Sequence, residues 1–278
     1  MANQIKFPAN RSNYPSLPAY ILFLFLGFSL VGCAGFNKNS IQDESGQSLQ
    51  MDQIPEQESL PKFSVNTARN GTPTGWNFYR IAPYKKNTVY RLENYQGKTV
   101  LSANSKISAS GLAVKLRPRS AQNLWLKWEW KVLEPIVDAD NADRYHDDAP
   151  LRILIAFDGN KSKLSLKEKL NFEMAGLISG QEIPYATLMY IWSGKSPIEA
   201  VLENAQTSRI KMIVVDSGWE NLGEWRNHER DLAADYKLAY GESPGQIIGV
   251  ALLTDTDNTK SETRAFYGDI ELIRKNPK

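Results

Sequence analysis

Cysteine is almost absent from the sequence: of 278 residues, only Cys33 carries a thiol. A disulfide within the chain is therefore excluded, and so is a metal site built from several thiolates. Histidine is nearly as scarce, with His146 and His228 as the only two residues of that type. A Ser-His-Asp triad could use only these two bases, whereas a glycosidase that works with two carboxylates needs no histidine.

An excess of charge of one sign is also missing. The formal net charge is +2, and Lys6 and Arg11 are the only charged side chains among residues 1–32. The remainder then has 31 basic residues against 31 acidic ones, with no basic stripe. Nucleic acid binding, which needs a positive footprint, is therefore not expected.

No apolar run in the sequence is long enough for a membrane span, but a shorter one is present at residues 21–31. Its roughly 11 residues fall short of the ~20 that a bilayer requires. Behind the basic Lys6 and Arg11, the run fits the apolar region of a signal peptide. It ends in Leu30-Val-Gly-Cys33, which resembles the cleavage motif of bacterial lipoproteins. A short signal-anchor with an incidental cysteine is the alternative.

The resemblance to lipoproteins implies that the signal peptide, residues 1–32, is removed and that Cys33 is lipidated, with fatty acids such as palmitate. Ala34, rather than Asp, follows the cysteine. This implies a place in the cell envelope on the outer membrane, facing the periplasm, if the source has two membranes. Residues 33–61 are polar and without period, which predicts a disordered tether. We expect one folded domain over residues 62–278.

Period-two alternation dominates this domain and predicts strands. In residues 124–132 one face carries Leu124, Leu126, Trp128, Trp130 and Val132, and the other carries Trp125, Lys127, Glu129 and Lys131. Residues 88–93 and 98–103, joined at Gln96-Gly97, predict a hairpin. Continuous apolar runs indicate central strands covered on both faces. These runs lie at 151–157 and 247–253, and further strands are expected at 111–117, 185–192, 209–215 and 265–273.

Two short helices interrupt the strands. Ser165 and Glu168 form a capping-box pattern, followed by one apolar face and by Gly180 as a stop. That face carries Leu166, Leu170, Met174 and Leu177. A second helix is expected over residues 229–240, before Gly241. Since no βαβ alternation is present, the pattern predicts an all-β fold, a single antiparallel β-sandwich of jelly-roll or galactose-binding-like type.

Several motifs occur along the predicted domain: Ser108–Leu112, Trp125–Trp130, Asp147-Asp148, Phe157–Gly159, Pro184–Trp192, Arg230–Tyr236, Thr254–Thr259 and Tyr267–Ile270. In combination they resemble an uncharacterised bacterial family, the domain of unknown function 3047. The resemblance covers about residues 75–272. It implies an exported bacterial domain and assigns no activity.

The segment Thr254–Thr259 could hold a metal ion. Asp255, Asp257 and Asn258 place hard oxygen ligands in a short loop between two predicted strands, and calcium prefers such oxygen clusters. The alternative is a hairpin loop whose Asp and Asn side chains cap its own backbone. No other cofactor is indicated.

An acidic loop precedes one of the central strands. It contains Asp138, Asp140, Asp143, His146, Asp147 and Asp148. Crowded carboxylates raise one another's pKa, recruit cations or bind sugar hydroxyls. We expect Asp147 and Asp148 to contact a ligand, with a solvated turn as the alternative.

Trp125 is an indole on a face shared with charged residues. Such an indole suits the apolar face of a sugar ring or a protein interface, unless another segment covers it. We therefore expect a lipid-anchored, non-catalytic module that binds a glycan or another envelope component through Trp125, Asp147 and Asp148. The alternatives are a carboxylate-dependent glycan hydrolase and a structural scaffold lipoprotein.

The anchor is directly testable. Because Cys33 is the only acylation site, Cys33→Ser should shift the protein from the detergent phase to the aqueous phase and leave the precursor uncut. Phase partitioning and mass spectrometry of the N-terminus measure both effects. A wild-type protein that retains Met1 would contradict the lipoprotein interpretation.

Overall fold

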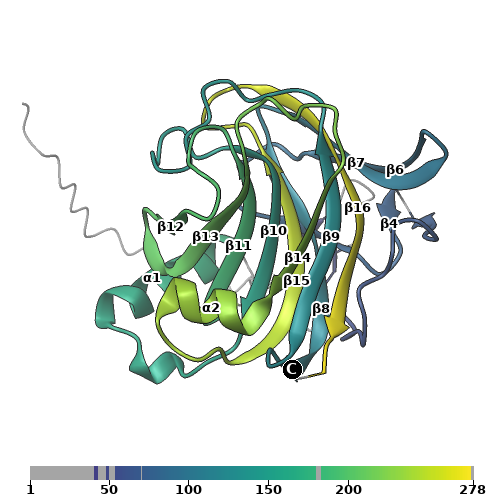
Figure 1. Cartoon of the computed structure of the whole chain (residues 1–278). Coiled ribbons are helices and arrows are strands. Elements are labelled where there is room, and N and C mark those ends of the chain that lie inside the picture. Colours follow the sequence, from purple (N-terminus) through teal and green to yellow (C-terminus); the bar gives the residue numbers. More distant parts are fainter. Residues whose placement is uncertain (1–40, 43–47, 50–53, 70, 180–182, 277–278) are drawn as a thin grey trace, which may run out of the picture. The chain divides into compact units, whose positions relative to one another are not determined.

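The computed structural model describes residues 41–42, 48–49, 54–69, 71–179 and 183–276. The predicted signal peptide, Cys33 and most of the predicted tether lie outside these residues. The described segments belong to one compact unit that starts at Asn39, and two large β-sheets dominate it (Figure 1).

The larger sheet has seven strands in the order β12-β13-β11-β10-β15-β8-β5, and the smaller has five in the order β14-β9-β16-β7-β6. The larger contains β5 (Asn77–Arg80), β8 (Ala109–Ser120), β10 (Ala149–Phe157), β11 (Ala186–Ser193), β12 (Val201–Asn204), β13 (Thr207–Ser217) and β15 (Gln246–Asp255). The smaller contains β6 (Val89–Tyr95), β7 (Lys98–Lys106), β9 (Leu124–Val132), β14 (Arg226–Asp231) and β16 (Glu262–Arg274). Two short pairs are formed by β1 (Ile41–Gln42) with β2 (Ser48–Leu49) and by β3 (Ala68–Arg69) with β4 (Thr72–Pro73).

The predicted β-sandwich is confirmed, with one departure from antiparallel order. β13 pairs parallel to β11, because β12 forms the sheet edge and β13 returns between the two. The predicted hairpin is also present as β6 and β7, with Gln96 and Gly97 at φ of 54° and 83°. Positive φ at both central residues is what a tight hairpin turn requires.

The core lies between the two sheets and is rich in aromatic rings. The alternation along β9 places Leu126, Trp128 and Trp130 inside. Trp128 stacks on Tyr190 of the other sheet, with ring centroids 5.1 Å apart. A second apolar cluster, which includes Ile191, Met212 and Val214, lies on the opposite face of the larger sheet. Its central strands are therefore apolar on both faces, as their continuous runs indicate.

Helix α2 (Leu232–Tyr240) contacts both sheets at one end of the sandwich, the lower end in Figure 1. It buries Leu232 and Tyr236, and its N-terminus is capped by the Asp231 carboxylate, which accepts hydrogen bonds from two backbone amides. The expected start at residue 229 is too early, because residues 226–231 pair with β9 as strand β14. Gly241 ends α2 in the left-handed conformation, as expected.

Helix α1 (Leu166–Ser179) begins with the predicted capping box. The Ser165 hydroxyl accepts a hydrogen bond from the backbone amide of Glu168, and the Glu168 carboxylate accepts one from the backbone amide of Ser165. Its apolar face is turned away from the core: Leu166, Leu170 and Met174 are 75%, 53% and 57% exposed. The side chain of Leu177 and the expected stop at Gly180 lie outside the described residues.

Packing extends ahead of the expected boundary at residue 62. Gln57 forms a parallel bridge with Leu116 in β8, and Leu60 is buried. Phe63 then stacks on Trp76 with ring centroids 5.0 Å apart. The end of the predicted tether is thus part of the domain, because a polar composition does not prevent backbone pairing with a strand.

Candidate functional site

Two chain segments that are distant in sequence meet at one end of the sandwich. The acidic loop leads from β9 into β10, and the Thr254–Thr259 segment leads from β15 into β16. They meet because Ala149 in β10 is paired with Asp255 in β15, and Val132 in β9 with Ala265 in β16. We call this region the acidic end.

Three carboxylates converge there: one oxygen from each of Asp148, Asp255 and Asp257 lies within 4.8 Å of the other two. Asp148 is fully buried and Asp255 is buried. The predicted ligand Asn258 lies beside this group: its backbone amide donates to Oδ1 of Asp148, and its side-chain nitrogen donates to the backbone carbonyl of Arg144. Asp148 is the carboxylate that the loop before β10 adds to the predicted pair.

The Asp148 carboxylate also organises the turn between β15 and β16. Its Oδ1 accepts a hydrogen bond from the Asn258 backbone amide at 3.2 Å. Its Oδ2 accepts from the backbone amide and the hydroxyl of Thr259, at 2.7 and 2.6 Å. Asp148 thus joins the two segments that meet at the acidic end.

Two cations lie among these acids. Arg152, buried on β10, donates to both oxygens of Asp255, at 3.1 and 3.3 Å, and to the backbone carbonyl and Oδ1 of Asp147, both at 2.9 Å. Lys85 pairs with Asp257 at 2.6 Å. Four carboxylates therefore face two cations, which leaves an excess of negative charge.

The pKa values indicate which carboxylate is most easily protonated because of this excess negative charge. Burial raises the pKa of Asp255 to about 7, and the charges of Asp148 and Asp147 add to this effect, although Arg152 opposes it. Burial would also raise the pKa of Asp147, but the charge of Arg152 and hydrogen bonds from Asn141 and Arg152 lower it overall. Near neutral pH the acidic end is therefore suited to hold either a proton on Asp255 or an added cation.

Two buried acceptor oxygens in this region have no hydrogen-bond partner, Oδ1 of Asp257 and Oδ1 of Asn141. The Asn141 amide nitrogen donates to Asp147 Oδ1 and to the backbone carbonyl of Asp148, at 3.1 and 2.9 Å. The other acids of the loop lie at the surface, where Asp143 pairs with His146 at 2.7 Å.

Trp125 lies at the opposite end of β9, beside the start of α2. It is half-buried on the outer face of the smaller sheet, and the Lys275 ammonium lies 3.8 Å from its ring centroid. Seven residues of strand separate it from the end of β9 near Asp148, about 23 Å at ~3.3 Å per residue. Trp125 and the pair Asp147-Asp148 therefore do not form one site.

The same outer face carries further aromatic side chains that the sequence alone did not indicate. Lys131 is expected in water but is buried. Its ammonium lies 4.8 Å from the Tyr95 ring and 5.8 Å from the Trp225 ring. Lys98 lies 5.2 Å from the Trp225 ring and pairs with Glu129. The hairpin and the segment before β14 thus bring rings over one end of this face.

A third polar cluster links the two sheets around Asp216 of β13. Its Oδ2 accepts from the Trp130 indole at 2.7 Å and lies 2.7 Å from Nε2 of His228, and its Oδ1 accepts from Arg226 at 3.0 Å. Burial would raise the pKa of Asp216, but His228, Trp130 and Arg226 together lower it. Since both oxygens are engaged, the cluster is a cross-link between sheets. In the sequence, the alternation of Arg226, His228 and Arg230 is the signal from which strand β14 and these contacts could have been predicted.

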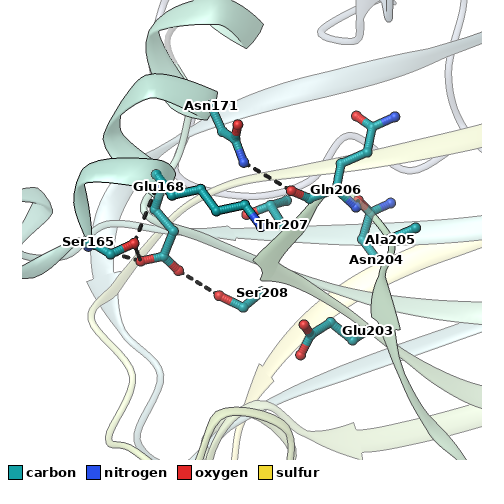
Figure 2. A pocket seen from close by; sticks show the side chains of 10 residues that line it. Ser165, Glu168, Asn171, Glu203, Asn204, Ala205, Gln206, Thr207 and Ser208 are labelled. Atoms are coloured by element: carbon teal, nitrogen blue, oxygen red, sulfur yellow. Dashed lines mark hydrogen bonds between the residues drawn. The ribbon is translucent and has the colours of Figure 1, made fainter.

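Figure 2 shows a polar pocket of about 280 Å³ between α1 and the turn that joins β12 to β13. Its polar groups bond to one another: Ser208 donates to Glu168 at 2.5 Å, and Asn171 donates to the backbone carbonyl of Gln206 at 3.0 Å. The bond from Ser208 is the main cause of the lowered pKa of Glu168. The pocket marks where α1 docks.

Residues 241–245, Gly-Glu-Ser-Pro-Gly, match the spacing of a nucleophile elbow. In an elbow the serine lies between a strand and the helix that follows it. Ser243 instead follows α2 and precedes β15. The two histidines are engaged elsewhere, by Asp143 and Asp216, so the motif is a connecting turn.

Comparison with known proteins gives a family and distant structural likenesses. Residues 74–271 match the family described as "Protein of unknown function (DUF3047)". No curated protein matches the sequence. No helix among the described residues is long and apolar enough to cross a membrane.

Solved structures with a similar fold include several carbohydrate-active proteins. A native family 12 xyloglucanase from Bacillus licheniformis is 8% identical, with a TM-score of 0.41 over 78% of this chain and 99% of that one. The xyloglucanase domain of NopAA from Sinorhizobium fredii is 8% identical, with a TM-score of 0.39 over 76% and 97%. The Endo-D glycoside hydrolase domain from Streptococcus pneumoniae R6 is 9% identical, with a TM-score of 0.30 over 73% of this chain, which spans 22% of that one. Likenesses at this level carry no argument about activity.

The raised pKa of Asp255 predicts a pH-dependent stability in the presence of chelator. The folded protein takes up a proton at Asp255 that the unfolded chain, with a pKa near 3.8, does not. This stabilising contribution is fully present below pH ~4 and is lost as the pH rises through about 7. The free energy of unfolding from denaturant titrations should therefore fall between pH 5 and about 7 and level off above that.

Asp255→Asn should flatten this part of the profile, whatever its effect on absolute stability. Asp138→Asn, at an exposed position of the same acidic loop, should keep the wild-type slope. Equal slopes for Asp255→Asn and the wild type would show that the proton is held elsewhere.

Proposed function

The chain belongs to the family described as "Protein of unknown function (DUF3047)", and we propose that it is a lipid-anchored, non-catalytic binding module of the cell envelope. The family description names no activity, so the proposal rests on the residues of this chain. Its ligand is a glycan or another envelope component, and Cys33 provides the anchor. The lipidation motif at residues 30–33 supports the anchor and the envelope location, on the outer membrane facing the periplasm in a source with two membranes.

The observation that carries the proposed binding role is the position of Trp125 on the outer face of the smaller sheet. Its partly exposed ring is bordered by Lys127 on its own strand and by Lys275, whose ammonium lies over the ring. Glycan recognition combines an apolar ring surface with hydrogen-bonding groups at its rim. The indole supplies the ring surface and Lys127 a hydrogen-bonding group at its rim, while Lys275, which pairs with Glu229, must leave the ring for a sugar to stack there.

The same face continues toward Trp225 and Tyr95, which lie over Lys131. Trp125 and Lys131 are six strand residues apart, or about 20 Å. Rings at both ends of this face, with Lys127 and Glu129 between them, suit an extended ligand of several sugar units. We assign the glycan-binding surface to this face.

The burial of the acidic end favours binding over hydrolysis. A glycosidase needs two carboxyl groups that reach a glycosidic bond. Asp148 is fully buried, Asp255 is 7% exposed, and their oxygens are engaged by Thr259 and Arg152. A polysaccharide has no access to this pair. In our proposal Asp147 and Asp148 support the fold at the acidic end and do not touch the glycan.

Substitution of Trp125 tests the proposed surface. Trp125→Ala should reduce binding to envelope glycans by about tenfold or more, since the loss of a central aromatic contact costs upwards of ~1 kcal/mol. The cost in unfolding free energy should stay below the ~3–5 kcal/mol of a fully buried aromatic residue, because the ring is partly exposed. Pull-down on isolated glycans and denaturant titration measure the two quantities.

Tyr145→Ala is the matched control, because Tyr145 is an aromatic residue that is 67% exposed on the acidic loop. It should leave binding unchanged. If Trp125→Ala binds as the wild type does, or loses several kcal/mol of stability as buried aromatic residues do, this surface has no role in binding.

We also propose that the acidic end binds calcium, through Asp148, Asp255 and Asp257. Calcium–oxygen distances of ~2.3–2.6 Å place ligand oxygens within about 5 Å of one another, and these three meet within 4.8 Å. The two unpartnered oxygens, on Asp257 and Asn141, and the excess of negative charge support the same proposal. Calcium would take the place of the proton on Asp255.

Thermal unfolding tests the calcium proposal. At 100 times its Kd, calcium should add ~2.7 kcal/mol to the unfolding free energy, a rise in Tm of roughly 5–10 °C for a domain of this size. Asp257→Asn should abolish the rise, whereas Asp138→Asn should retain it, because Asp138 is exposed and does not belong to the three-carboxylate group. Identical melting curves in calcium and in chelator would exclude a site.

A further inference from the structure

Helix α1 has an unusual orientation, because three of its described apolar side chains face solvent while polar side chains on its other side bond to the domain. Leu166, Leu170 and Met174 follow one another at intervals of four residues and are 75%, 53% and 57% exposed. Residues spaced in this way lie on one side of a helix. We call these three residues the α1 stripe.

The opposite side of α1 attaches to the domain by hydrogen bonds. Glu168 accepts from Ser208, and Asn171 donates to the backbone of Gln206 (Figure 2). At 100° per residue, Glu168 and Asn171 lie about 100–160° from Leu170. The α1 stripe therefore does not belong against the domain core, because α1 is already attached to the domain by polar contacts on its other side.

Lysines surround the α1 stripe. Residues 161–174 contain lysines at 161, 163, 167 and 169 and glutamates at 168 and 173, a net charge of +2 in a mature chain that is formally neutral. Lys167 and Lys169 follow the stripe on its two sides, about 60° and 100° from Leu170. Of the two acids, Glu168 is already bonded to Ser165 and Ser208.

We propose that the α1 stripe docks on an anionic phospholipid surface, with α1 lying in the plane of the headgroups. A short helix with leucines on one face and lysines beside them is the composition of an interfacial helix. Long lysine side chains keep their ammonium groups at the headgroup level while their stems cover apolar surface. Protein interfaces are, by contrast, depleted in lysine, which favours lipid as the occupant.

The inference rests on the proposed anchor at Cys33 in one respect, that the anchor holds the domain within reach of the membrane. It adds a second attachment point with a defined orientation. With α1 on the lipid, a tethered domain would present one side to the membrane and keep the others for ligands.

The test uses the full-length, lipidated protein reconstituted in vesicles, with a polarity-sensitive fluorophore on a single introduced cysteine. Cys33 is the only native cysteine, so an acylated wild-type chain takes no label. Leu170→Cys places the label on the α1 stripe. Leu238→Cys, at a 60% exposed position of α2, is the matched control.

In vesicles of phosphatidylethanolamine and phosphatidylglycerol, the label at 170 should shift to the blue and brighten by about two-fold or more, since an interfacial helix sinks ~5–10 Å into the headgroup boundary. Nitroxide-labelled lipids should quench it. The label at 238 should show neither effect. Neutral phosphatidylcholine vesicles, or Lys163→Gln with Lys167→Gln, should weaken the response at 170.

The outcomes separate this inference from the anchor. Labelling of the wild type at Cys33, or failure to float with vesicles, refutes the anchor. A protein that floats while the labels at 170 and 238 respond equally refutes the docking of α1. An equal response in neutral vesicles overturns the proposed preference for anionic lipid. A fluorescence shift at 170 that appears without lipid and grows with protein concentration identifies a second copy of the chain as the occupant instead.

Discussion

The buried guanidinium of Arg152 is the interaction on which the acidic end depends. It joins Asp147 of the incoming loop to Asp255 at the end of β15, and its third nitrogen reaches the sulfur of Met212 in β13 at 3.3 Å. Removing one partner of such a buried pair costs ~3–5 kcal/mol. The arrangement also explains the unbalanced charge: Arg152 can neutralise only part of the carboxylate cluster that it helps to assemble. In our proposal, a proton on Asp255 or a bound calcium ion completes the balance.

The strand directions determine which residues can act together. β9 begins near α2 and ends at the acidic end, so its first and last residues belong to different ends of the sandwich. The acidic end is buried and engaged in ion pairs, whereas the outer face of the smaller sheet carries an exposed Lys127 and the partly exposed rings of Trp125 and Trp225. The buried end thus suits a stabilising cation, and the open face suits an extended ligand.

Local patterns in the sequence predict much of this fold. Strict alternation identified β9, the Gln96-Gly97 pair identified a hairpin, and Ser165 with Glu168 identified the start of α1. These features depend on neighbours within a few residues. β14 was missed because residues 226–231 are all polar. Its inward side chains are tolerated because Asp216 and Asp235 lie opposite them. Such partners depend on tertiary structure, which overrides strand propensity.

The site was harder to predict for the same reason. Asp148 joins Asp255 through the pairing of β10 with β15, and that register is not visible in either segment alone. Lys131 was expected in water, but rings from residues 95 and 225 cover it. Asn258 lies beside the cluster through its backbone amide, which donates to Asp148. Residue type indicated the chemistry in each case, and long-range packing decided the outcome.

The central claim is that the ligand meets the outer face of the smaller sheet and not the acidic end. The most direct measurement is an NMR titration with envelope glycan fragments, in which the indole N–H signals of the tryptophans serve as separate reporters. The account predicts that the signals of Trp125 and Trp225 shift, while those of the buried Trp128 and Trp130 stay in place. Shifts confined to the backbone of residues 147–149, with Trp125 unchanged, would contradict it.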